Sequence, residues 1–74
     1  MTERARGEGV FAGSVVSFDV VAGLGEVLRD DGQRFGFHCI EIADGTRAVD
    51  PGTPVTFGLL PKLGRYEAAR ITRA

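Results

Sequence analysis

Few side chains in this sequence have the types and spacing that reaction chemistry requires. The chain has one histidine and one cysteine, which are adjacent at His38 and Cys39. A closed structural zinc site needs about four nitrogen or sulfur ligands, and a nucleophilic cysteine needs a base held by a third group. Adjacent strand residues also point to opposite faces. We therefore expect no catalytic residue, no enzyme activity, no metal site and no cofactor, with Cys39 as a small buried apolar residue.

Binding chemistry is better represented, because aromatic rings can stack on unpaired bases and cations can contact phosphates. Eight of the nine cationic residues are arginine, whose guanidinium group both stacks and donates paired hydrogen bonds. The net charge of −1 gives no overall attraction for a polyanion, so the distribution of charge over the surface decides. The candidate nucleic-acid-binding residues are His38, Phe18, Tyr66, Arg34, Arg47, Arg65 and Arg70.

The elements that position these side chains are expected to be short β-strands. Runs rich in Val, Phe, Ile and Thr are separated by glycine-containing turns at roughly 8–12 residues, which is typical of a small barrel or sandwich. Asp31-Gly32 suits a tight hairpin turn, so the second and third strands should pair directly. Residues 1–9 are expected to form a disordered N-terminal tail and residues 10–74 a single domain. The expected strands are residues 10–20, 24–30, 33–38, 54–60 and 65–72.

Alternation within the strands predicts which side chains enter the core. Phe35 and Phe37 share one face of the third strand and should point inward. In the last strand, Ala69 and Ile71 can point inward, whereas Tyr66, Ala68 and Arg70 point outward. The first strand does not alternate cleanly, which predicts a bulge or strong coiling.

Composition also bears on location. A single cysteine excludes an internal disulfide and fits a reducing compartment. No apolar stretch approaches the roughly 20 residues that a bilayer-spanning helix needs, and the polar N-terminus is unlike a secretion signal. We expect a cytoplasmic protein with no membrane partner.

Several segments, in the same order, resemble a cold-shock domain. Residues 16–18 match the end of its first strand, and residues 22–27 (A-G-L-G-E-V) and 35–38 (F-G-F-H) match its two ribonucleoprotein-type motifs. Residues 51–57 (P-G-T-P-V-T-F) resemble its E-G-Q-x-V-x-F segment, and residues 68–71 (A-A-R-I) resemble its closing A-A-N-V segment. The resemblance covers about residues 10–73. It implies a small five-stranded antiparallel OB-type Greek-key barrel that binds single-stranded RNA or DNA through the outer face of strands two and three.

The stacking positions depart from that family. Its tryptophan falls on Ser17, its two first-motif phenylalanines on Leu24 and Glu26, and its second-motif phenylalanine on Gly36. The leading lysine of the first motif falls on Ala22, which removes a phosphate contact. Because each stacked base contributes roughly 1–3 kcal/mol, binding is expected to be weak or altered in preference.

Two functions therefore stay open at this point, beside a third possibility that the domain binds nothing through this face and acts through another surface. In the first, His38 matches the family's motif histidine and forms a displaced platform with Tyr66 or Phe18, while arginines contact phosphates. In the second, a barrel that has lost nucleic-acid binding presents Leu24 and Glu26 to a protein partner or to a homodimer. Convergence of the candidate arginines on the His38 face would favour nucleic acid, and an apolar, acidic face would favour protein.

Overall fold

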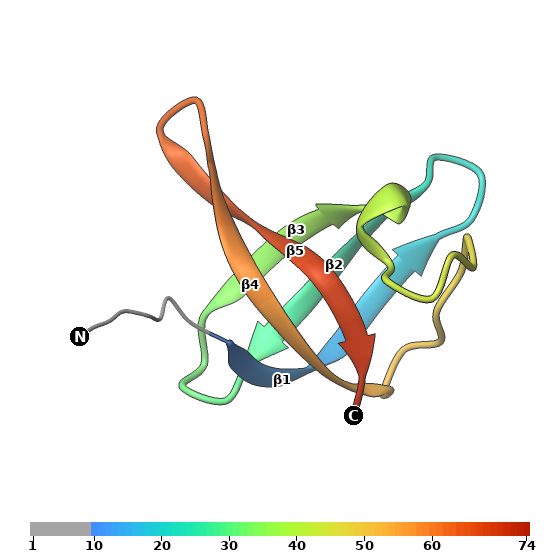
Figure 1. Ribbon diagram of the computed structural model, residues 1–74, viewed down its shortest axis with the longest axis horizontal. Helices are drawn as coiled ribbons and strands as arrows, with labels where there is room; N and C mark the ends of the chain where they lie inside the picture. The colour runs from blue at the N-terminus through green and yellow to red at the C-terminus, as the bar shows by residue number, and fades with distance from the viewer. Residues whose placement is uncertain (1–9) are drawn as a thin grey trace.

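The structure is a computed structural model that describes residues 10–74, which form one five-stranded antiparallel sheet (Figure 1). The order β3-β2-β1-β4-β5 makes β3 and β5 the two edges. The all-β, five-stranded antiparallel prediction is thus confirmed, and the tail expected at residues 1–9 lies outside the described residues. The elements are β1 (Phe11–Asp19), β2 (Leu24–Arg29), β3 (Arg34–His38), the 3₁₀ turn η1 (Cys39–Glu41), β4 (Pro54–Lys62) and β5 (Arg65–Arg73).

The sheet curls strongly, so that its two edge strands approach each other (Figure 1). β1 lies at the centre of the curl, because it pairs with β2 along residues 13–19 and with β4 along residues 11–14. Its register with β2 shifts between Val15 and Ser17, which confirms the irregularity predicted for this strand. After η1, Ile42 forms a parallel bridge with Ile71 of the edge strand β5.

The apolar core fills the inside of the curl. Phe35 and Phe37 are buried there, as the alternation predicts, and the Phe35 ring packs against Phe57 with 6.1 Å between ring centroids. The β2–β3 hairpin forms across Asp31-Gly32 with Gly32 at a φ of 94°, which confirms the direct pairing of these strands. The largest fully buried side chains are Phe57, Ile71, Val15, Val27 and Val55.

Arg29 closes one end of this core. Its guanidinium carbon lies 4.7 Å from the Phe11 ring centroid and 5.0 Å from that of Phe35. The same group donates hydrogen bonds of 3.0 and 2.7 Å to the carboxylate of Asp31. These bonds lower the pKa of Asp31 and raise that of Arg29. Arg29 therefore has a structural role and is already occupied by ring and carboxylate contacts.

The last strand departs from simple alternation. Ala68 is 1% exposed and Ile71 is 2% exposed, although three positions separate them, and Arg70 between them has a φ of 51°. The left-handed Arg70 interrupts the alternation, and its backbone N–H donates to a Glu41 carboxylate oxygen at 3.1 Å. The prediction that Ala68 points outward is wrong, because alternation counted through this irregularity assigns the wrong face.

Asp44 connects the loop after η1 to the end of β5. Its carboxylate accepts hydrogen bonds from the Thr46 hydroxyl at 2.7 Å, the Thr46 backbone N–H at 3.0 Å and Arg73 Nε at 2.9 Å. These bonds lower the pKa of Asp44 from 3.8 to about 2. The Thr46 hydroxyl has the largest effect, and Arg73 has the next largest. The ionised carboxylate thus holds the loop against β5.

We expect the free energy of unfolding to fall as the pH drops from about 4 to about 2, and to fall less in Asp44→Asn. A carboxyl group with a depressed pKa stabilises the fold above its unfolded pKa near 3.8, and this contribution is lost as the pH falls through the folded value of about 2. Urea unfolding between about pH 6 and about pH 2 measures the difference. The same acid dependence in both proteins would contradict this role of Asp44.

Candidate functional site

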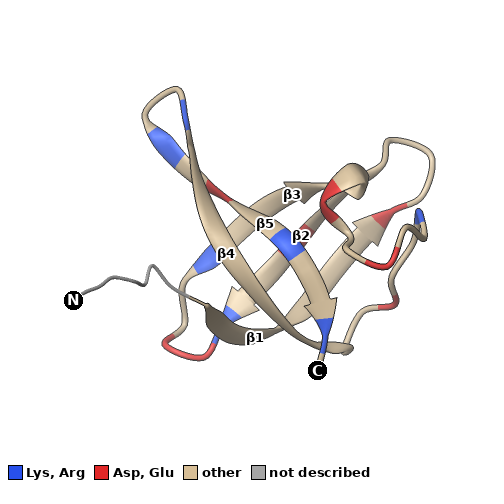
Figure 2. Ribbon diagram, in the orientation of Figure 1, with Lys and Arg blue, Asp and Glu red and all other residues tan. Residues whose placement is uncertain are grey.

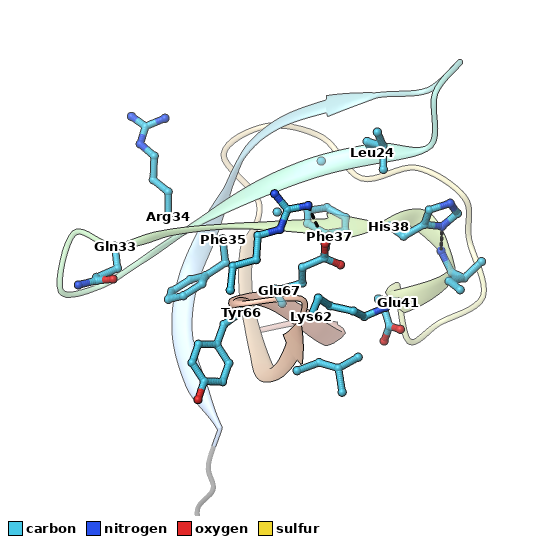
Figure 3. A pocket seen from close by; sticks show the side chains of 16 residues that line it. Leu24, Gln33, Arg34, Phe35, Phe37, His38, Glu41, Lys62, Tyr66 and Glu67 are labelled. Carbon is cyan, nitrogen blue, oxygen red and sulfur yellow. Dashed lines mark hydrogen bonds and ion pairs between the residues drawn. The ribbon is translucent and has the colours of Figure 1, made fainter.

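A groove of about 750 Å³ lies between the edge strand β3 and the outer half of the β4–β5 hairpin (Figure 3). The outer half of this hairpin projects beyond the rest of the sheet, and its inner side forms one wall of the groove (Figure 1). We call this site the β3–β5 groove. It is lined by Leu24, Gly25, residues 33–38, Ile40, Glu41, Leu60, Lys62 and residues 65–68.

The β3–β5 groove brings together four of the residues predicted to bind nucleic acid. Arg34 and His38 come from β3, and Arg65 and Tyr66 come from β5. Tyr66 is 58% exposed and lies two positions from the buried Ala68, so its ring continues the core-facing side of β5 beyond the core. Figure 3 shows Tyr66 towards one end of the groove and His38 at the other, with the Arg34 side chain directed away from Tyr66 on the other side of β3.

The other three candidate residues lie elsewhere. Phe18 is half-buried, and its ring stacks on Phe37 with 5.9 Å between centroids and 21° between ring planes. It borders a separate pocket of about 350 Å³ next to β1 and β2. Arg47 lies in the loop between η1 and β4, and Arg70 lies in the middle of β5; neither lines the groove. Two of the four candidate arginines thus line the same groove as His38, and the other two do not.

Charges of both signs lie at the groove. Lys62 joins Arg34 and Arg65 as a third cation, and Figure 2 shows cations at the hairpin tip and at the start of β3. Arg34 donates to a Glu26 carboxylate oxygen at 3.2 Å, and Arg65 pairs with Glu67 at 3.5 Å. Ion pairs between exposed side chains are weak, so these guanidinium groups can exchange a carboxylate for a phosphate. Lys62 was missed because a strand and turn pattern does not show where a hairpin tip lies.

His38 terminates β3 and caps η1. Its Nδ1 accepts a hydrogen bond from the Ile40 backbone N–H at 3.3 Å, which leaves Nε2 as the N–H donor of the neutral ring. The Cys39 sulfur also lies 3.7 Å from Nδ1. His38 is exposed and Cys39 is buried, as the alternation and the expectation of a buried Cys39 predict, although these two atoms meet where the backbone turns into η1.

The outer face of β2 and β3 has no Phe, Tyr or Trp ring, and His38 is the only ring on it. Gly25 is required by packing, because a Cβ atom there would lie 2.5 Å from the Phe37 ring and 2.8 Å from that of Phe18. Gly36 has open space instead, with only the Gly25 oxygen 3.8 Å from a Cβ atom at this position. Among the exposed large apolar side chains of residues 10–74, Tyr66 is the only aromatic one. An exposed tyrosine ring is thus found at the groove and not on the outer face.

No family model matches the chain, and no curated protein matches it. The similarity to cold-shock domains therefore stays a prediction that rests on the sequence motifs. Residues 10–74 contain no group of three or more His, Cys, Asp or Glu side chains that could hold a metal ion. In the same part of the chain, no helix has the length and apolar character needed to cross a membrane.

Proposed function

We propose that the protein binds single-stranded nucleic acid in the β3–β5 groove, and that the curled sheet is an OB-type Greek-key barrel. The strand order and the parallel bridge between Ile42 and Ile71 support a barrel of this type. The observation that carries the proposed function is the gathering of an exposed tyrosine, a histidine and three cations at one groove. Sites for single strands combine stacking rings with a basic groove in this way.

Each groove residue has a role in this proposal. Tyr66 supplies the ring on which one base stacks, and Arg34, Lys62 and Arg65 contact phosphates. His38 Nε2–H donates a hydrogen bond to a base or a phosphate. One ring gives roughly 1–3 kcal/mol of stacking, so the affinity is weak and carries little sequence preference. Three phosphate contacts on a single strand give a slope of log K against log salt of about −2.

Fluorescence polarisation with labelled pyrimidine-rich DNA and mixed-sequence RNA tests this function at low and physiological salt. Arg65→Gln is expected to weaken binding about fivefold and to make the salt slope less steep by about 0.7, because one phosphate contact is lost. Arg47→Gln removes the same charge outside the groove and should leave the affinity within about twofold. No binding by the wild type at low salt, or an equal loss in both variants, would contradict the proposal.

An apolar patch supports the alternative function, contact with a protein partner or a second copy. Val20, Val21, Leu24 and Ile40 are all exposed. The turn between β1 and β2, which contains Val20 and Val21, is joined to the start of η1 by a hydrogen bond of 2.8 Å from the Cys39 N–H to the Gly23 carbonyl oxygen. Clustered apolar side chains mark interaction sites. If no oligonucleotide binds, contact with a protein partner or a second copy is therefore tested at this patch.

A further inference from the structure

Leu63 occupies a position that neither packing nor turn chemistry explains. It lies at the tip of the β4–β5 hairpin, between the paired residues Lys62 and Arg65, and its side chain is 106% exposed. Its φ is 42°, and that of the following Gly64 is 87°. Two-residue hairpin turns with two positive φ angles favour Asn, Asp or Gly at the first position, where a leucine is strained. A residue that breaks local rules in this way is often retained for function.

The surroundings of Leu63 combine apolar and cationic groups. Lys62 and Arg65 pair on either side of the Leu63-Gly64 turn, and both also line the β3–β5 groove. Figure 2 shows these cations at the projecting tip of the hairpin. The exposed apolar side chains Leu60 and Tyr66 lie farther down the same hairpin. An aliphatic side chain thus projects between two cations, next to the end of the groove.

We propose that Leu63 is a wedge that inserts between neighbouring bases of a single strand held in the β3–β5 groove. This inference rests on the proposed function and adds a contact outside the groove itself. In it, Lys62 and Arg65 contact the phosphates on either side of the separated bases, so the cation–leucine–cation pattern matches the alternation of phosphate and base. Leucine is among the apolar side chains that separate stacked bases. Insertion also removes the fully exposed Leu63 side chain from water.

An anionic membrane surface presents a related pattern of negative charge above an apolar layer. The nucleic acid is favoured because Lys62 and Arg65 also line the groove that contains Tyr66 and His38, which links the tip to a stacking site. A single exposed leucine also offers little apolar area, whereas stable membrane anchoring depends on a large buried apolar face.

The variant Leu63→Asn tests the wedge, because it should move two measurements in opposite directions. Asparagine tolerates a positive φ, so the melting temperature is expected to rise. Loss of the aliphatic side chain is expected to weaken the binding of a mixed-sequence single strand about fivefold. Leu63→Met keeps an apolar side chain of similar size at the same strained position and should bind within about twofold of the wild type. An oligonucleotide containing 2-aminopurine should brighten on binding wild type, as the base unstacks, and brighten less with Leu63→Asn.

The outcomes separate this inference from the proposed function. If Leu63→Asn binds like the wild type while Arg65→Gln binds more weakly, the wedge is overturned and the proposed function stands. If the wild type binds no oligonucleotide at low salt, both are overturned. Vesicles that contain phosphatidylserine provide the third measurement. Vesicle binding that is lost in Leu63→Asn, with no change in oligonucleotide affinity, would assign the tip to membranes and overturn the wedge.

Discussion

Replacement of Gly13 by alanine is expected to remove a large share of the protein's free energy of unfolding. A Cβ atom at this position would lie 2.1 Å from the Leu28 carbonyl oxygen and 3.0 Å from Arg29 Cα. Both are backbone atoms of the neighbouring strand, so no side-chain rotation relieves the contact. Gly13 pairs with β2 on one side and with Val55 of β4 on the other, so a backbone shift disturbs two pairings. Overpacking costs about 1–3 kcal/mol or more, a large share of the roughly 3–5 kcal/mol available to a domain of this size.

Urea or thermal unfolding of Gly13→Ala measures this loss, with Gly36→Ala as the matched control. Gly36 also lies in a strand, but a Cβ atom there would have only the Gly25 oxygen nearby, at 3.8 Å. The control should be neutral or slightly stabilising, because alanine restricts the unfolded chain more than glycine does. Equal stability of the two variants would show that β1 and β2 do not approach as closely at Gly13 as described.

The second large effect is expected at Tyr66, where replacement by alanine should weaken single-strand binding about 5- to 150-fold. This range corresponds to the loss of about 1–3 kcal/mol for one stacked base. Tyr66 is the only aromatic residue among the exposed large apolar side chains of residues 10–74, so no second ring there can replace it. Its side chain is 58% exposed, so thermal stability should change little. Fluorescence polarisation and thermal unfolding of the same preparations measure the two quantities.

Two further variants show whether the Tyr66 effect comes from stacking. Tyr66→Phe keeps the ring and should bind within a few-fold of the wild type. Phe18→Leu should lower stability but not affinity, because the Phe18 ring stacks on Phe37 and lies outside the β3–β5 groove. Wild-type affinity in Tyr66→Ala would exclude base stacking at this position.

Much of the fold could be predicted from local sequence patterns. Alternation in β3 places Phe35 and Phe37 in the core, and Asp31-Gly32 predicts the β2–β3 hairpin. The uneven pattern of β1 predicts its irregular register. These predictions are confirmed because each depends on residues that are neighbours in the chain, or on a pairing that one short turn imposes.

Predictions that counted across an irregularity were wrong. Ala68 was placed on the outer side of the last strand, although it is buried. The left-handed Arg70 causes this difference, and the Glu41 carboxylate that accepts its N–H lies in a distant part of the sequence. Alternation in one strand contains no information about such a contact. Because Tyr66 lies two positions from Ala68, the same irregularity puts Tyr66 on the core-facing side of β5.

The sequence by itself determined an all-β chain, the approximate extent of its strands, part of its core, and a set of aromatic and basic residues capable of binding. Only the tertiary structure decided which of these residues meet. Arg34 and Tyr66 lie on the two edge strands, β3 and β5, at opposite ends of the strand order. They share a groove because β1 pairs with both β2 and β4, and the resulting curl brings the edges together. Sheet curvature arises from twist and packing summed over all five strands, so it cannot be derived from the pattern of any single strand.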